Sequence, residues 1–319
     1  MEHISNSDFI QLDMLNKYCR YFRGEEALAD VGNTVVIILK ALLKLVTSII
    51  GIFTSSIKKI ISFIVYKLSM VSQNIRYIAK NKNNPTFTEN LSKIQISQGI
   101  PLTDYTDYLY RLINAIGALN DFISMFSVTE QILEISLLKP EEDGIYIKPP
   151  QFLVTEQIYN SKFKENMEYI GIILKPLEST VYNGTVVYSK CTIDYSSKLP
   201  GLYEQNKTIT ELGYTSEAFV KCYNNSYSRL NGLVEDARQY QTGLEKIKTS
   251  LIKLLSKLEK NTEHPGDITN PNHKINKVKL LIENTTVCLA IYGKLLVAAM
   301  EYITWFQQIT TAATTAGKI

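Results

Sequence analysis

The chain has 319 residues, of which 45% are hydrophobic and 20% are charged. This composition supports a folded core and excludes an intrinsically disordered chain. Because 34 basic residues face 31 acidic ones, the formal net charge is only +3. A protein that covers nucleic acid with its whole surface would be more basic, and we expect no specific nucleic-acid recognition.

The cysteines and the N-terminal segment restrict the chemistry and the location. Four cysteines are scattered without CxxC spacing, at positions 19, 191, 222 and 288. We therefore expect buried free thiols, with no metal site and no cofactor. Residues 1–30 carry several acids before the first apolar run, unlike the basic start of a secretory signal peptide. We expect no signal peptide and a protein kept or packaged in a cytoplasm.

Residues 35–78 predict a long helix that is both apolar and basic. Small and polar residues recur there in steps of three and four along one narrow face, and the rest is apolar. Between residues 31 and 91 the sequence has eight basic residues and one acid, Glu89. That segment therefore has a charge of +7, and the rest of the chain has a charge of −4.

Two interpretations of this helix remain open. An anionic membrane surface attracts a basic, apolar helix. Alternatively, the segment is a core helix of a large bundle, and its lysines mark the edge that faces water. Both hold if the helix is sheltered first and released later. The candidate membrane-binding residues are Lys40, Lys44, Lys58, Lys59, Lys67, Ile49, Ile50, Ile52, Phe53 and Phe63.

A polar connector and then a second helical segment follow. The polar connector Asn81–Pro101 breaks the helical pattern and closes an N-terminal region, residues 1–100. Apolar residues at helical spacing then predict one bundle helix within residues 101–139, from Thr103 to Leu138, which Pro140 ends.

Residues 140–214 predict a small α+β insertion. The double proline at 149–150 favours an extended arm, and residues 156–173 favour a short helix with Pro176 just beyond its end. Asn183-Gly184 stands between two β-branched runs, within residues 180–188. This dipeptide takes the positive φ angles of a two-residue type I′ turn, so the pattern predicts a β-hairpin.

The C-terminal third is the most regular part. Two apolar series in heptad steps, joined by a loop at residues 261–272, predict an antiparallel coiled-coil hairpin over residues 215–309. The tail, residues 310–319, is small and polar, and we expect it to fray. The predicted seam consists of Leu230, Leu233, Ala237, Tyr240, Leu244, Ile247, Leu251, Leu254, Leu258, Ile282, Leu289, Leu296, Ile303 and Phe306.

The predicted fold class is therefore mostly α: an elongated helical bundle with a C-terminal antiparallel coiled-coil hairpin and a small α+β insertion containing a β-hairpin. No Walker loop, GxGxxG, GxSxG, HExxH or EF-hand pattern is present in the sequence. We expect a protein that is not an enzyme. The enzymatic alternative is an unrecognised site in the insertion, near residues 182–191, and a deep pocket with perturbed ionisable groups would support it.

The first 80 residues resemble the internal head proteins of large tailed bacteriophages. The resemblance rests on an acidic start, the lysine-punctuated helix IILKALLKLVTSIIGIFTSSIKKIISFI, and a long helical remainder. It implies a protein packaged in the capsid interior that leaves with the genome and acts at the host envelope. It transfers no functional residue.

From these observations we expect a structural or virion-internal protein whose basic apolar helix engages a host membrane. Its expected location is the virion or the cytoplasm of an infected cell. Its expected partners are other copies of itself or other structural proteins, with an anionic membrane as a further candidate. The alternative is a helical pore-forming or membrane-remodelling protein, in which residues 35–67 insert after oligomerisation.

Overall fold

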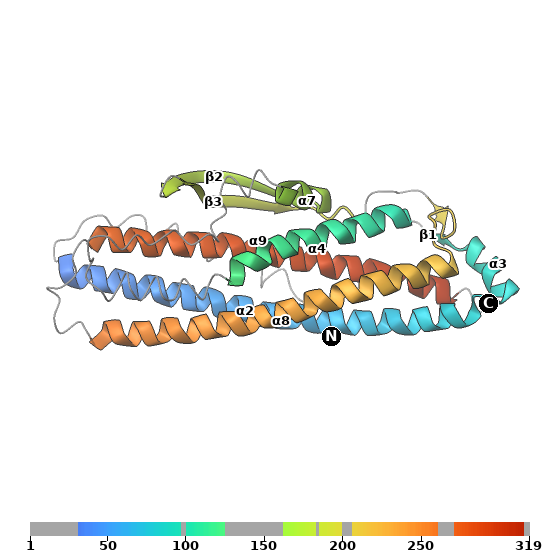
Figure 1. Ribbon diagram of the computed structural model, residues 1–319, viewed down its shortest axis with the longest axis horizontal. Helices are drawn as coiled ribbons and strands as arrows, with labels where there is room; N and C mark the ends of the chain where they lie inside the picture. The colour runs from blue at the N-terminus through green and yellow to red at the C-terminus, as the bar shows by residue number, and fades with distance from the viewer. Residues whose placement is uncertain are drawn as a thin grey trace.

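The computed structural model describes residues 31–96, 100–124, 162–182, 185–199, 206–260 and 271–315. These residues are mostly helical, and the strands among them form two small antiparallel sheets, each of two strands. Figure 1 shows an elongated molecule in which the helices lie along the long axis.

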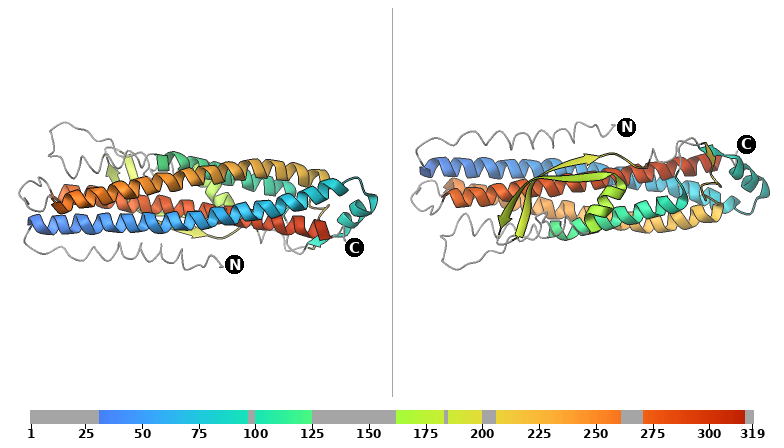
Figure 2. Two further views of the ribbon diagram at one scale, coloured as in Figure 1. Left: turned by 90° about the horizontal axis from the view of Figure 1, so that it is seen from below. Right: turned by 90° about the horizontal axis from the view of Figure 1, so that it is seen from above.

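Three long helices form the body of the molecule: α2 (Val31–Asn81), α8 (Ser216–Lys260) and α9 (Pro271–Thr315). The 51 residues of α2 correspond to a length of about 77 Å. Along this length α2 lies closely against both other helices. It runs parallel to α9 and antiparallel to α8, as the two further views in Figure 2 also show. We call α2, α8 and α9 the three-helix core.

The pattern of buried residues explains why α2 packs along its whole length. Its buried side chains follow one another in steps of three and four, which places them on one face of a helix. This face is made almost entirely of isoleucine, leucine and valine. The series is Ile50, Phe53, Ile57, Ile60, Ile64, Leu68, Val71, Ile75 and Ile78.

Helix α9 is buried around most of its circumference in its C-terminal half, where α2, α4 (Leu102–Ser124) and β3 (Thr185–Tyr195) cover it. An aromatic cluster joins α4 to α9. The Tyr105 ring stacks on the Tyr302 ring at 4.0 Å between centroids and lies 4.9 Å from Trp305 and 5.2 Å from Phe306. All four side chains are buried. This cluster anchors α4 on the three-helix core.

The polar connector expected at residues 81–101 contains a short helix, α3 (Pro85–Lys93). The predicted break between the long helices is present, and the short helix within it was not predicted. The Asn84 side chain accepts hydrogen bonds from the backbone N–H groups of Thr86 and Phe87, and Pro85 stands in the first turn, which is a favourable helix start. Beyond α3, β1 (Gln95–Ile96) pairs with β4 (Lys207–Thr208).

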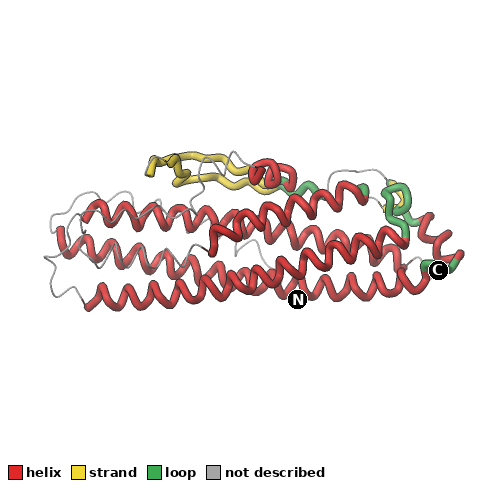
Figure 3. The backbone as a smooth tube through the Cα atoms, viewed as in Figure 1, coloured by secondary structure: helices red, strands yellow, loops and turns green. Residues whose placement is uncertain are grey.

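The predicted β-hairpin is confirmed and is longer than expected. Strand β2 (Ile172–Tyr182) pairs antiparallel with β3, and Tyr182 faces Thr185 across a two-residue connection. Figure 3 shows this hairpin as a pair of yellow tube segments along the side of the red helices. The connecting residues 183–184 and the predicted extended arm at the double proline 149–150 lie outside the described residues.

The helix before the hairpin, α7 (Lys162–Ile170), ends earlier than predicted. Gly171 turns the chain with a φ of 92°, and the residues after it already belong to β2. Pro176, expected just beyond a helix, stands inside that strand opposite Cys191, beside an irregularity in the register. A two-stranded sheet has free edges, so a strand position without an N–H group is tolerated there.

The two C-terminal helices stand where the heptad steps predicted them. Among the predicted seam residues, Tyr240 is half-buried, the side chains of Ile247, Leu254, Leu258 and Ile282 are outside the description, and the others are buried. However, α8 and α9 each make their most extensive helix–helix contacts with α2. The two C-terminal helices therefore pack on a third helix, α2.

The prediction of a frayed tail was wrong for residues 310–315, which continue α9. Thr310 and Ala313 are fully buried. The Asn74 side-chain amide donates to the hydroxyl oxygens of Thr310, at 3.2 Å, and Thr311, at 3.0 Å. Contacts with α2 thus stabilise a helical conformation in residues 310–315, whose composition alone does not favour a helix.

Candidate functional site: the basic face of helix α2

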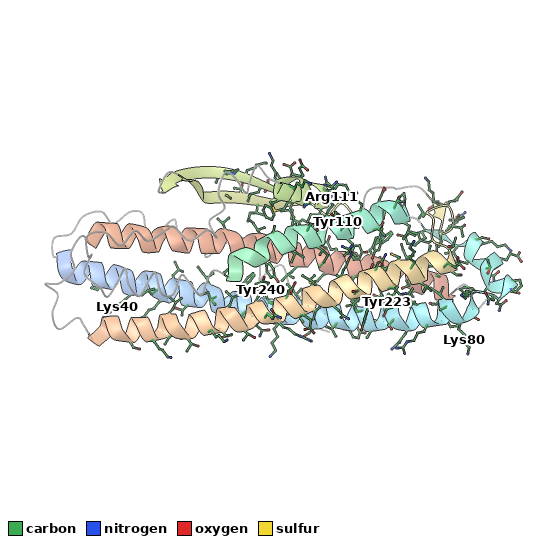
Figure 4. The ribbon with its side chains drawn as sticks, viewed as in Figure 1. Lys40, Lys80, Tyr110, Arg111, Tyr223 and Tyr240 are labelled. Carbon is green, nitrogen blue, oxygen red and sulfur yellow. The ribbon has the colours of Figure 1, made fainter. Side chains whose placement is uncertain are left out.

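Helix α2 carries seven basic residues and no acid over its 51 residues. Of the predicted membrane-binding lysines, Lys44, Lys58 and Lys59 are exposed and Lys40 is half-exposed. Figure 4 labels Lys40 and Lys80 near opposite ends of the helix. The positive charge is therefore distributed along the whole helix.

Lys67 has a different role from the other candidate lysines. Its Nζ atom donates to the side-chain oxygen of Gln307 on α9 at 2.6 Å and lies 5.3 Å from the centre of the Phe63 ring. Lys67 and Phe63 are both half-buried. Lys67 is thus part of the contact between α2 and α9, and Phe63 lies beside it on α2.

The apolar candidates face the opposite way from the exposed lysines. Ile49, Ile50 and Phe53 are buried, and Ile52 is half-buried. The Phe53 ring lies 6.0 Å from the Tyr292 ring of α9, and Tyr240 of α8 lies 5.5 Å from the same tyrosine. In this arrangement the candidate set divides into a cationic outer face and an apolar inner face.

Small residues let the inner face approach α8 closely. A Cβ atom at Gly51 would lie 3.2 Å from Nζ of Lys248, so this lysine of α8 lies directly over the glycine. Thr47 and Thr54 are buried, and their hydroxyls donate to backbone carbonyls within α2. Lys248 is a cation at the middle of α2 that the sequence pattern did not connect with this site.

Two stretches within the described residues are long and apolar enough to cross a membrane, Leu43–Asn81 of α2 and Leu289–Thr315 of α9. They lie side by side in the three-helix core. Because the core helices of a soluble bundle have the same composition, length and apolarity alone do not separate the two interpretations of α2.

The region named for the enzymatic alternative has one nucleophilic group among its described side chains. Burial raises the pKa of the Cys191 thiol to about 12, so the thiolate that would act as a nucleophile is scarce near neutral pH. Within the described ranges, no group of three or more His, Cys, Asp or Glu side chains is arranged to bind a metal ion.

Comparisons with protein-family models, with curated proteins and with solved structures found no match to this chain.

Proposed function

We propose that this chain is a non-enzymatic structural protein whose helix α2 binds an anionic membrane surface through its outer lysines. In this proposal the protein is an elongated helical bundle in which α8 and α9 each pack on the inner face of α2. The resemblance of the N-terminal region to phage internal head proteins supports a virion-internal protein that acts at a host envelope.

The observation that carries the proposal is the sorting of charge on α2. A helix that only filled a core would normally carry acids and bases on its wet face, whereas this one carries seven bases and no acid. Each lysine or arginine near an anionic bilayer contributes about 1 kcal/mol of attraction. Exposed Lys44, Lys58 and Lys59 give α2 enough attraction for reversible binding while its apolar face stays buried.

The test is co-sedimentation of the purified protein with phosphatidylglycerol-containing and neutral vesicles. A Lys44→Glu/Lys58→Glu variant removes two attractive charges and adds two repulsive ones. We expect its affinity for the anionic vesicles to fall by about thirtyfold or more. Neutral vesicles should bind neither protein.

A matched control is Lys246→Glu/Lys253→Glu, which makes the same change of net charge on exposed positions of α8. We expect it to stay within roughly a factor of three of the wild type, because the difference reports local contact and not overall charge. Equal losses in both variants, or no binding by the folded wild type, would contradict a membrane-binding face on α2.

A second candidate function is pore formation, which the adjacent apolar stretches of α2 and α9 favour. Opening of the three-helix core would release two segments of membrane-spanning length together. Release of a trapped dye from anionic vesicles by the protein alone would support this function. Binding without leakage would support attachment to the surface only.

A further inference from the structure

A groove between α2 and α8 contains two hollows, both further toward the C-terminal end of α2 than the exposed lysines Lys44, Lys58 and Lys59. The first has a volume of about 320 Å³, and its lining includes Val65, Ser72, Gln73 and Arg76 of α2 and Tyr227 and Asn231 of α8. The second, of about 470 Å³, lies further toward the C-terminal end of α2 and includes Lys82, Lys221 and Glu217 in its lining. Both volumes fall within the size range of small-molecule sites.

The first hollow has the chemistry of an oxyanion site. Its charged lining residue is Arg76, which is exposed and enters none of the ion pairs found among the described residues. The side chains of Ser72, Gln73 and Asn231 supply hydroxyl and amide donors around it. A guanidinium presents a planar fork of N–H groups that matches two oxygens of a phosphate.

The rim of the same hollow is apolar and aromatic. Of its lining residues, Val65 is 40% exposed and Tyr227 is 41% exposed, and Tyr66, which follows Val65 in the sequence, is 44% exposed. The Tyr227 ring lies 5.3 Å from the ring of Tyr223, which Figure 4 labels on α8. Exposed tyrosines beside a cation are typical of the headgroup level of a membrane, where the ring lies in an apolar layer and the hydroxyl stays wet.

We infer that the Arg76 hollow binds the phosphate of an anionic phospholipid headgroup, with Val65, Tyr66 and Tyr227 lying against the bilayer surface. This inference rests on the proposed membrane function and adds a defined lipid site to it. Arg76 would hold the phosphate through paired N–H donors, and Asn231 and Gln73 would complete the contacts. The groove would thus fix which side of the molecule meets the membrane.

The test compares the affinities of four proteins for vesicles containing phosphatidylglycerol: the wild type, Arg76→Lys, Arg76→Gln, and Arg238→Lys as the control. Arg238 is exposed on α8 and does not line the hollow. Arg76→Lys keeps the charge and loses the planar fork, so we expect about fivefold weaker binding, and about tenfold or more for Arg76→Gln. Arg238→Lys should bind like the wild type.

Wild-type affinity in Arg76→Lys would overturn the site, because attraction by charge alone does not distinguish lysine from arginine. If the Lys44→Glu/Lys58→Glu variant loses binding in the same assay, the membrane function stands and only the lipid site fails. Titration with inorganic phosphate in the absence of vesicles tests whether free phosphate, and not a lipid headgroup, is the ligand of the hollow. Micromolar binding of phosphate, together with unchanged vesicle binding in Arg76→Gln, would overturn the lipid as ligand.

Discussion

At the scale of single residues, the buried tyrosines are the most informative group. Tyr105 and Tyr302 are fully buried, and burial raises the pKa of both phenols well above 10. The hydroxyls of Tyr302 and Ser226 form a hydrogen bond of 2.9 Å, and the Tyr105 hydroxyl donates to the Tyr302 carbonyl at 3.2 Å. These groups satisfy one another only while they are neutral.

Alkaline pH should therefore unfold the protein. A group whose pKa is higher in the folded than in the unfolded state stabilises the fold fully below the unfolded pKa, about 10 for tyrosine. As the pH rises above 10, each such phenol should remove about 1.4 kcal/mol of unfolding free energy per pH unit. Urea midpoints between pH 8 and pH 11 measure this effect. Tyr302→Phe should reduce the slope, and an unchanged slope would contradict the assignment to buried phenols.

At the scale of elements, the junction between α7 and β2 depends on one glycine. Gly171 has a φ of 92°, and a Cβ atom there would lie 1.9 Å from the Ser196 carbonyl oxygen. The backbone N–H of Ser196 also donates to the Gly171 carbonyl at 2.9 Å. The start of the hairpin can close on its end only because this residue has no side chain.

We expect Gly171→Ala to lower the free energy of unfolding by about 3 kcal/mol or more, because it adds both a strained φ and a steric clash. Gly232→Ala, at a position of α8 where the new methyl group meets nothing within 4 Å, should instead stabilise the protein by roughly 0.5–1 kcal/mol. Chemical denaturation compares the two. Similar effects of both substitutions would show that the turn does not constrain the fold.

The elements themselves were predictable to different degrees. Heptad steps located α8 and α9, and Asn183-Gly184 located the hairpin, because these are local patterns with one strong solution. The short helix α3 was missed although Asn84 and Pro85 mark its start, since a nine-residue polar helix has little periodicity. Residues 310–315 were misjudged because the buried contacts of Thr310 and Ala313 with the rest of the fold do not show in local composition.

At the scale of the whole molecule, the sequence predicted the two faces of α2 but not their neighbours. The apolar face of a helix predicts that another element covers it. The spacing of the apolar residues does not identify which helix that is. In the structure α8 and α9 cover this face, and the Lys248 side chain lies over Gly51. The Arg76 hollow lay beyond sequence reasoning for the same reason, since its lining comes from two helices about 150 residues apart in the chain.

If membrane action requires α2 to part from α9, a link between them should block it without blocking attachment. Cysteines in place of Asn74 and Thr311, whose side chains lie 3.0 Å apart, can be joined by a cleavable bis-maleimide in a background without the native thiols. The only tryptophan, Trp305, is 7% exposed in the core and reports opening by its fluorescence. We expect the linked protein to bind anionic vesicles with unchanged emission, and cleavage to allow a spectral shift.

A Thr311→Cys single variant treated with the same reagent controls for the modification. An identical shift with the link intact would show that the shift does not require α2 to part from α9. No shift even after cleavage would show that the apolar face of α2 stays buried at the membrane, so that the exposed lysines alone hold the protein there.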